Sequence, residues 1–505
     1  MTSARIARAR SATVIGVDAY EVVIECVRTR GLPALRIVGL PDAAVREAGD
    51  RVRTAVQQCG LDWPRDRIVL NLAPADLPKG GSAFDLAIAC AVLAASGQVP
   101  ADALDGVVLV GELGLDASVQ PAATALTVAR GLARSTASTP TRLLVATQTA
   151  HQLGCIDRVD AVGVDHLREV VELLRGARVR RPVKRHPPRR RVGDDDLADV
   201  RGQPVARRAI EIAAAGGHHV LLSGPNGTGK SMLARRVRGL LPDLDDAAAV
   251  DVAAIRAAAG LANSTDTIDV TPPLREVHPP TTAAALVGGG SGIPQPGDMT
   301  LAHHGVLVLD ELGEFRRAVL DTLRQPLETA QVHLGRGRHH VTYACRVLLA
   351  ATTNRCPCGR RGDPARACRC RPDELERYRS RLSEPLRDRI DLHVDVQPVD
   401  LSAHTSDGEP TAVVAARVAV AREHAAQRWG RGRLVRDATR DELSRAVGQH
   451  ARARAQHAAK ALGLSARGLD RIVRVARTIA DVEGESTVGP THVDEAVHYR
   501  AFGAM

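Results

Sequence analysis

Short apolar segments alternate with alanine-rich stretches over the first third of the chain. Each segment is rich in Val, Ile or Leu and has the length of a β-strand. The predicted strands are Ala12 to Val17, Glu21 to Val27, Ile68 to Leu72, Gly106 to Val110 and Arg142 to Ala146. With helices between them, these strands predict a self-contained α+β domain over residues 1–174.

A second alternation begins at Asp199 and is typical of a mostly parallel sheet with helices on its faces. The predicted elements are a helix over Gln203 to Ala215, a strand over His219 to Leu222, a Gly-rich loop with a following helix, and strands over Val306 to Leu309 and Val347 to Ala351. We place this α/β core at residues 199–400. Residues 401–505 are rich in Ala and Arg without strand signals, which predicts a separate helical lid.

Residues 175–198 lie between the two patterns. The stretch from Arg175 to Arg191 holds nine Lys or Arg residues, three prolines and almost nothing apolar, so it predicts an exposed linker. Two interpretations stay open, a solvated spacer and a clamp on a phosphate backbone.

Composition narrows the class of protein. A chain of 505 residues with 44% hydrophobic content can bury several cores, and about three domains are expected. It has neither the ~18 consecutive apolar residues of a membrane helix nor the apolar segment of a signal peptide, so we expect a cytoplasmic protein without membrane contact. The net charge of +10 fits a polyanion partner, but only four basic residues are lysines, which indicates a coding bias toward Arg. Aromatic residues make up 2%, so any contact with DNA is expected at the backbone and not by base stacking.

The Gly-rich loop has the spacing G-x-x-x-x-G-K-S of a phosphate-binding loop, directly after an apolar strand and before a helix. Its residues are Gly224, Pro225, Asn226, Gly227, Thr228, Gly229, Lys230 and Ser231. Backbone N–H groups of such a loop surround phosphates, and the following helix N-terminus favours negative charge. Lys230 would neutralise the β and γ phosphates of ATP, and Ser231 would bind Mg²⁺.

Two later strands end in polar residues. The segment GVLVLDEL ends in Asp310 and Glu311, which we expect to hold Mg²⁺ and to activate the attacking water, respectively. The segment RVLLAATTN ends at Asn354, which by its position could hold the same water or simply form a turn.

Further motifs extend over almost the whole chain. They are VIGVDAY, GLPALRIVGLPDAAVREAGDRVRTAV, NLAPADLPKGG, TAAALVGGGS, LAHHGVLVLDELGEF, LRQPLE, RYRSRLSEPLRDRIDLHVDV and RIVRVARTIAD. In these motifs the chain resembles the YifB/ComM family of magnesium-chelatase-like AAA+ ATPases. The resemblance implies an N-terminal ribosomal S5 domain 2-like fold shared with Lon protease, a P-loop AAA+ core and a chelatase-type C-terminal helical lid.

The resemblance also implies site residues and a ring. Asn354 becomes the sensor 1 residue, Arg389 in LRDRIDL matches the arginine finger, and Arg467 in LSARGLD matches sensor 2. An arginine finger acts on the nucleotide of a neighbouring subunit, so a ring, expected to be a hexamer, belongs to the mechanism. The chain departs from the family at Asn226, where AAA+ proteins usually carry proline, at TTN in place of AMNP, and at EVHPPT in place of a double-histidine segment.

The likeness to Lon raises the question of peptidase activity. Ala83 stands at the position of the Lon nucleophile, next to Ser82, and Leu126 stands near the position of the Lon lysine. Since there is no lysine between Lys79 and Lys184, the sequence predicts a Lon-like domain without a catalytic dyad.

Four of the nine cysteines lie close together as two C-x-C pairs, Cys356 with Cys358 and Cys368 with Cys370. Four thiolates can close a tetrahedral Zn²⁺ site, and such a site would be structural because no ligand position stays open. Free or redox-active thiols are the alternative. The five scattered cysteines are expected to be small buried side chains.

The segment VHLGRGRHHVTY predicts a hairpin with Arg336 and Arg338 at its turn. Related ring motors point such a hairpin into the central pore, where these arginines would grip phosphates. An ordinary exposed turn is an equal alternative.

Three functions follow from the resemblance. The first is an ATP-driven DNA translocase or helicase for branch migration in recombination or natural transformation, acting on single-stranded or branched DNA. The others are a protein-remodelling ATPase or assembly scaffold, and the ATPase subunit of a metal chelatase. The Lon-like domain argues against the third, because chelatase motor subunits resemble only the later part of this chain.

Overall fold

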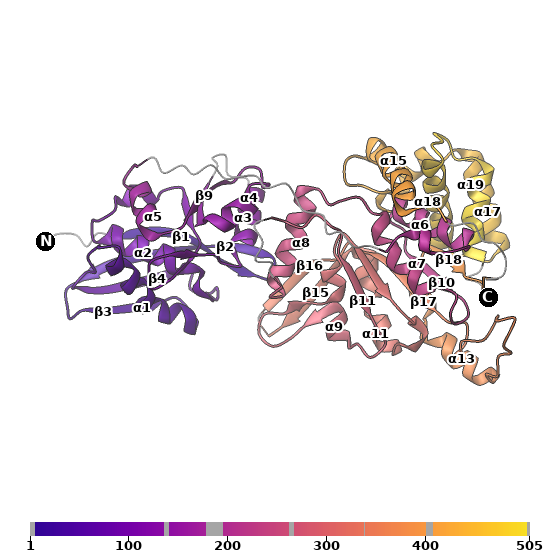
Figure 1. Cartoon of the computed structure of the whole chain (residues 1–505), viewed down its shortest axis with the longest axis horizontal. Coiled ribbons are helices and arrows are strands. Elements are labelled where there is room, and N and C mark those ends of the chain that lie inside the picture. Colours follow the sequence, from indigo (N-terminus) through magenta and orange to yellow (C-terminus); the bar gives the residue numbers. More distant parts are fainter. Residues whose placement is uncertain are drawn as a thin grey trace. The chain divides into compact units, whose positions relative to one another are not determined.

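The computed structural model describes residues 6–135, 141–177, 195–261, 267–337, 339–399 and 408–501. The chain forms two compact units, one of residues 1–190 with 245–270, the other of residues 191–244 with 271–505. Figure 1 shows both units coloured along the sequence. Most of the predicted linker, residues 178–194, lies outside the described residues.

Unit 1 is built on a seven-stranded mixed sheet in the order β3-β4-β2-β1-β5-β8-β9. Its strands are β1 (Ala7–Ile15), β2 (Asp18–Thr29), β3 (Ala34–Val38), β4 (Arg67–Ala73), β5 (Val107–Leu109), β8 (Arg142–Ala146) and β9 (Asp160–Val164). A separate short pair consists of β6 (Glu112–Leu113) and β7 (Val119–Gln120). The sheet contains all five predicted strands.

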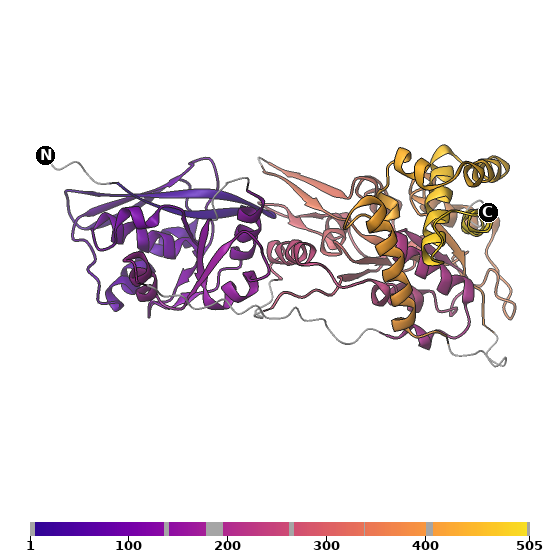
Figure 2. The same ribbon diagram turned by 90° about the horizontal axis from the view of Figure 1, so that it is seen from above.

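Helices cover this sheet on both faces. They are α1 (Ala43–Gln58), α2 (Asp85–Ala95), α3 (Ala125–Arg134), α4 (Thr147–Leu153), α5 (Leu167–Leu174) and α8 (Asp246–Ala258). Successive residues of β8 enter different apolar clusters, Leu144 with α1, α2 and α5, and Leu143 with α3, α4 and α8. Figure 2 shows the same elements from above.

Helix α8 corrects the predicted domain division. Residues 245–270 were expected within the α/β core, but they belong to unit 1. Val250 and Ala254 are buried in the cluster of α3, and Asp251 accepts hydrogen bonds from Arg130 at 2.5 Å and Arg134 at 2.9 Å. The sequence of this segment has a helical pattern, but the pattern does not show which sheet the helix covers. Its apolar face packs in unit 1.

Unit 2 contains an all-parallel five-stranded sheet in the order β11-β14-β17-β10-β18. Its strands are β10 (Val220–Ser223), β11 (Leu274–Val277), β14 (Val306–Leu309), β17 (Leu348–Thr353) and β18 (Leu392–Asp395). Two hairpins accompany it, β12 (Gly288–Gly289) with β13 (Gln295–Pro296) and β15 (Gln331–Arg336) with β16 (His339–Ala344). The predicted parallel sheet is confirmed.

The helices around this sheet fall into two groups. Those of the α/β part are α6 (Pro204–Gly216), α7 (Lys230–Arg236), α9 (Ala283–Val287), α10 (Asp298–Leu301), α11 (Arg317–Asp321), α12 (Arg324–Thr329), α13 (Pro372–Arg381) and α14 (Glu384–Arg387). Those after residue 408 are α15 (Thr411–Trp429), α16 (Arg440–Ala446), α17 (Gln449–Ala461), α18 (Ala466–Val482) and α19 (Pro490–Ala501).

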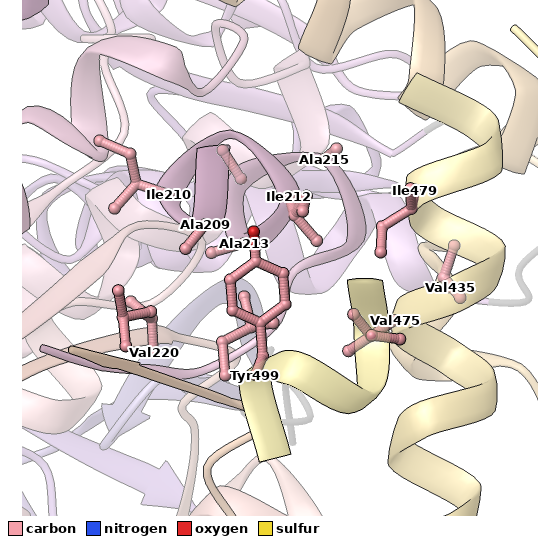
Figure 3. Close-up of a cluster of buried hydrophobic side chains, with 14 of the residues drawn as sticks. Ala209, Ile210, Ile212, Ala213, Ala215, Val220, Val435, Val475, Ile479 and Tyr499 are labelled. Atoms are coloured by element: carbon pink, nitrogen blue, oxygen red, sulfur yellow. The ribbon is translucent and has the colours of Figure 1, made fainter. Parts of the chain in front are cut away.

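The C-terminal helices share one apolar core with the sheet. Helix α6 packs between β10 and helices α15 and α18, and one cluster of buried residues joins all of them. Figure 3 shows Ile212 of α6 and Ile479 of α18 in this cluster, with Tyr499 of α19 beside them. The prediction of a helical region is confirmed, but its helices belong to the same compact unit as the sheet.

The linker ends earlier than predicted. Leu197 is fully buried, and its N–H donates to the Thr411 hydroxyl at 2.7 Å. The residues from Asp195 onward therefore belong to unit 2. Within the described residues, no helix combines the length and the apolar character that a membrane crossing requires.

Candidate nucleotide site

The Gly-rich loop joins β10 to α7 at the carboxyl edge of the parallel sheet. Gly227 and Gly229 have φ values of +79° and +86°, a region that L side chains rarely adopt. At Gly224 a Cβ atom would lie 2.2 Å from the Val396 carbonyl oxygen, so only glycine fits against the chain after β18. The glycine spacing read from the sequence therefore has a geometric cause at three positions.

Lys230 is buried at the start of α7. Its ammonium group donates to the carbonyl oxygens of Gly224 at 3.0 Å and Pro225 at 2.6 Å. Burial lowers the pKa of Lys230 to about 8, although Asp310 and Glu311 act in the opposite direction. A phosphate chain could replace the two carbonyl partners and restore full charge on this lysine.

One further residue, Thr352, takes part in a hydrogen-bond network with Ser231, Asp310 and Glu311 beside the loop. The Asp310 carboxylate accepts hydrogen bonds from the hydroxyls of Ser231 and Thr352, each at 2.6 Å. The Thr352 hydroxyl in turn accepts the Glu311 N–H at 3.0 Å. Sequence reasoning missed this role of Thr352, since it treated the TTN segment only as a departure from the family pattern.

Glu311 itself is exposed and has a left-handed backbone, with φ of +58°. Its side chain therefore projects from the turn after β14 instead of following the strand. Asn354 comes directly after β17, which pairs in parallel with both β10 and β14. Gly224, Asp310 and Asn354 thus stand at the same edge of the sheet, as predicted.

These residues fit a magnesium nucleotide. A buried cation, a serine hydroxyl and a carboxylate converge at the end of a loop whose glycines permit close backbone approach. Hydroxyl and carboxylate oxygens are the ligands that Mg²⁺ prefers. ATP would lie on the loop with Lys230, while Ser231 and Asp310 would hold Mg²⁺.

Arg389 and Arg467 both contact the Glu328 carboxylate. Arg389 forms an ion pair with Glu328 and donates to the Pro385 carbonyl at 2.7 Å. The Arg467 guanidinium lies 3.5 Å from the same Glu328 carboxylate, with 64% of its side chain exposed. Within the described part of the chain, the partner that these two arginines share is Glu328 and not a loop residue.

The four clustered cysteines lie between β17 and α13. Their ligand atoms are all within 4.8 Å of one another, and Cys356 is buried while the other three are half-buried. The cysteine segment also contacts the phosphate-binding loop, because the Gly359 carbonyl accepts the Asn226 N–H at 2.9 Å. Of the scattered cysteines, Cys155 is half-buried and the other four are buried.

The predicted hairpin is confirmed as β15 and β16, with Arg336 paired to His339 at its end. Arg336 is exposed. Arg338 lies outside the described residues, so the pair of arginines expected at this turn is described only in part.

In unit 1, Ser82 donates from its hydroxyl to the Glu112 carboxylate at 2.5 Å. Lys79 is buried and donates to the Pro74 carbonyl. Ala83 and Leu126 are buried apolar residues. The hydrogen bonds of Ser82 and Lys79 thus lead to different partners, and the absence of peptidase activity stays a prediction.

Comparisons with known proteins cover nearly the whole chain. The family model "Magnesium chelatase, subunit ChlI" matches residues 196–404, "Subunit ChlI of Mg-chelatase" matches residues 24–148, and "Magnesium chelatase, subunit ChlI C-terminal" matches residues 408–500. The YifB protein of Salmonella typhimurium is 41% identical over 97% of this chain and 96% of its own length. The competence protein ComM of Haemophilus influenzae is 37% identical over 96% of both chains. Lon protease 2 of Bacillus subtilis is 32% identical over 158 residues, which cover 29% of this chain and 28% of the protease.

Proposed function

Because this chain belongs to the YifB/ComM family of magnesium-chelatase-like AAA+ ATPases, we propose that it is an ATP-hydrolysing ring motor that moves DNA. The family implies ATP and Mg²⁺ as ligands. The finer assignment, a translocase or helicase for branch migration in recombination or natural transformation, draws on the printed name of the relative ComM, a competence protein.

The hydrogen-bond network around Asp310 carries the proposal for ATP hydrolysis. Lys230 would bind the phosphates, and the Ser231 hydroxyl and the Asp310 carboxylate, which lie 2.6 Å apart, would hold the metal ion. Bound Mg²⁺ would stabilise negative charge on the transferred phosphoryl group. Glu311 accepts the proton of the attacking water, and Asn354 orients that water. Thr352 holds the backbone of Glu311 against Asp310, which keeps base and metal ligand in fixed relation.

The arrangement of Arg389 and Arg467 supports action between subunits. Both side chains meet Glu328, and the Arg467 side chain is largely exposed. A neighbouring subunit in a ring, expected to be a hexamer, could receive both arginines at its γ-phosphate. There they would stabilise transition-state charge.

DNA as the substrate draws support from charge and shape. The chain carries a net charge of +10, and the exposed Arg336 stands at the end of a two-stranded hairpin. Guanidinium groups on such a projection can contact phosphates without reading bases. We expect single-stranded or branched DNA as the preferred form and the cytoplasm as the place of action.

The test is ATPase activity of the full chain with and without single-stranded, duplex and branched DNA, at low and high salt. Stimulation by DNA that declines at high salt supports a DNA motor, because phosphate contacts weaken steeply with ionic strength. The DNA that stimulates most names the substrate. Turnover that is independent of every DNA overturns the DNA assignment and favours a motor that remodels proteins.

A variant pair sharpens this test. Glu311→Gln should bind both ATP and DNA but lose hydrolysis, since the amide cannot accept the proton. Glu314→Gln, three residues further along the same turn, where Glu314 pairs with Arg381 at 3.1 Å, changes the charge equally and should keep hydrolysis. Equal loss in both variants would contradict the role given to Glu311.

A further inference from the structure

The four clustered cysteines have the geometry of a metal site. The Sγ atom of Cys356 lies 3.4 Å from that of Cys358 and 3.7 Å from that of Cys368, and Cys358 and Cys368 are also 3.7 Å apart. A tetrahedron with metal–sulfur bonds of about 2.3 Å has edges of about 3.8 Å. A disulfide would bring two sulfur atoms to about 2.05 Å, so these distances fit shared ligation of one ion.

The surroundings of the cluster favour thiolates. The Arg361 N–H donates to the Cys356 sulfur at 3.3 Å. Six arginines and one aspartate lie in the segment of residues 355–371. A Zn²⁺ ion with four thiolates carries a net charge of −2, which these guanidinium groups can balance. Four sulfur ligands leave no open position, so the ion would be structural.

The same segment is attached to the phosphate-binding loop. Gly359 follows Cys358 directly and closes a turn by donating its N–H to the Cys356 carbonyl at 3.0 Å. Its own carbonyl accepts the Asn226 N–H at 2.9 Å. A Cβ atom on Gly359 would lie 2.1 Å from the Asn226 side chain, and its φ is +69°. The contact therefore depends on the turn that the first cysteine pair forms.

Three further contacts connect the cysteine segment and the following helix α13 with other parts of the nucleotide site. Arg355, just before the cluster, forms an ion pair with Asp395 at the end of β18. After the cluster, Tyr378 of α13 packs against Gly313, and Arg381 donates to the Gly313 carbonyl at 2.8 Å. Gly313 belongs to the turn that carries Glu311. The cysteine segment thus connects the loop, β18 and the acidic turn.

Asn226 makes this connection possible at the loop. Proline, the usual AAA+ residue at this position, has no N–H to donate, so it could not form the bond to Gly359. From these contacts we propose that Cys356, Cys358, Cys368 and Cys370 bind one Zn²⁺, and that the zinc-closed turn holds the phosphate-binding loop in its nucleotide-binding conformation. Zinc then acts as a structural ion with control over nucleotide affinity.

The first test is metal content. The full chain, purified under reducing conditions, should contain one zinc per chain, and Co²⁺ in its place should give the absorption bands of a tetrahedral thiolate site. Cys358→Ser should lower the zinc content, whereas Cys155→Ser, a half-buried cysteine of unit 1, should leave it at one. Zinc-free protein with four reactive thiols in the cluster would overturn the site.

The second test asks whether zinc binding affects nucleotide binding. It measures the affinity for a fluorescent ADP before and after zinc is removed by a chelator. In the unchanged chain, removal should weaken binding about ten-fold, the effect of losing one ordered hydrogen bond and the loop that it holds. Added Zn²⁺ should restore affinity. In Asn226→Pro, zinc should still bind, but its removal should no longer change nucleotide affinity.

This comparison separates a local effect from unfolding. If zinc removal weakens nucleotide binding equally in both proteins, or in neither, the coupling is overturned. Both tests are independent of DNA and of hydrolysis, so they can fail while the motor proposal stands. Zinc-loaded protein that binds no nucleotide at all would instead contradict the assignment of the phosphate-binding loop.

Discussion

Thr352 is the residue that joins the metal ligand to the general base. It is almost fully buried, and its hydroxyl contacts Asp310 and the backbone of Glu311. Thr352→Val keeps the shape but removes both hydrogen bonds, so kcat should fall about ten-fold while nucleotide affinity changes by less than about two-fold. Steady-state hydrolysis and nucleotide titration measure the two effects.

The matched control is Thr54→Val in unit 1, where the hydroxyl donates to the Asp50 carbonyl at 2.9 Å on an exposed helix surface. It should leave kcat unchanged. If Thr352→Val weakens nucleotide binding as much as it slows turnover, then Thr352 supports the whole site and not the placement of the base.

Lys230 should make nucleotide binding dependent on pH. Its pKa is lowered to about 8 by burial, so near pH 8 the free protein holds about half a proton on this amine. Phosphates favour the charged form and raise the pKa, so binding should take up about half a proton, and affinity should decline as the pH rises above 8. Calorimetry in two buffers with different ionisation enthalpies measures the uptake.

Lys230→Arg supplies the control for this measurement, because a guanidinium stays charged throughout this pH range. The variant should bind nucleotide without the extra proton. Equal uptake in both proteins would assign the proton to the nucleotide or to another group.

Sequence reasoning found the residues of the nucleotide site that have a local pattern. The glycines of the loop, Lys230 and the acidic strand end all follow from spacing within one short segment. The role of Thr352 and the contact between Asn226 and Gly359 do not, because each joins positions far apart in the chain. Such contacts depend on which strands lie side by side, and only the fold shows this.

At the scale of elements, helix α18 depends on a buried ion pair. Arg477 and Asp481 lie one turn apart, 3.0 Å from each other, with exposed side-chain fractions of 0% and 1%. Arg428 of α15 also contacts Asp481, at 2.7 Å. Asp481→Ala would leave Arg477 buried without its carboxylate, which should cost about 3–5 kcal/mol and lower the unfolding temperature of unit 2 by roughly 5 to 10 °C.

Asp494→Ala provides the comparison in thermal unfolding. Asp494 pairs with Arg454 at 2.6 Å, but both side chains are about half exposed, at 54% and 50%. Solvent screens this pair, so its loss should leave the unfolding temperature almost unchanged. Similar effects of the two variants would show that burial does not set the contribution of Asp481.

Elements with a strong apolar pattern were predictable, and short mixed ones were not. Strand β14 appears at its predicted bounds, and α6 is shifted by one residue at each end. Strands β11 and β18 were missed because LREV and LHVD each contain two apolar and two polar or charged residues in only four positions. These two strands form the edges of the parallel sheet, and each is stabilised by pairing with the strand beside it more than by its own sequence.

At the scale of the whole molecule, the sequence predicted the order of the domains along the chain. It did not predict that residues 245–270, which belong to unit 1, interrupt the sequence of unit 2. Helix α8 follows the phosphate-binding loop in sequence, yet its apolar residues complete the core of unit 1. Helical periodicity shows that a face is apolar without showing which sheet covers it. For Arg389 and Arg467 the sequence likewise predicted roles but no contacts. Their common contact with Glu328 is visible only in the fold.

Assembly gives the most direct test of the arginines. Glu311→Gln removes the base of a subunit's own site, whereas Arg389→Ala removes the group proposed to act on the neighbour. Each variant alone should lose hydrolysis. In a ring assembled from equal amounts of both, some interfaces combine an intact Glu311 with an intact Arg389, so about a quarter of the normal activity should return.

The control is a mixture of Glu311→Gln with Lys230→Ala, which should stay inactive. Every nucleotide site in that mixture lacks either its base or its lysine, and an intact arginine from the neighbouring subunit cannot replace them. If the first mixture stays as inactive as the second, Arg389 does not act between subunits, and the ring loses its place in the mechanism.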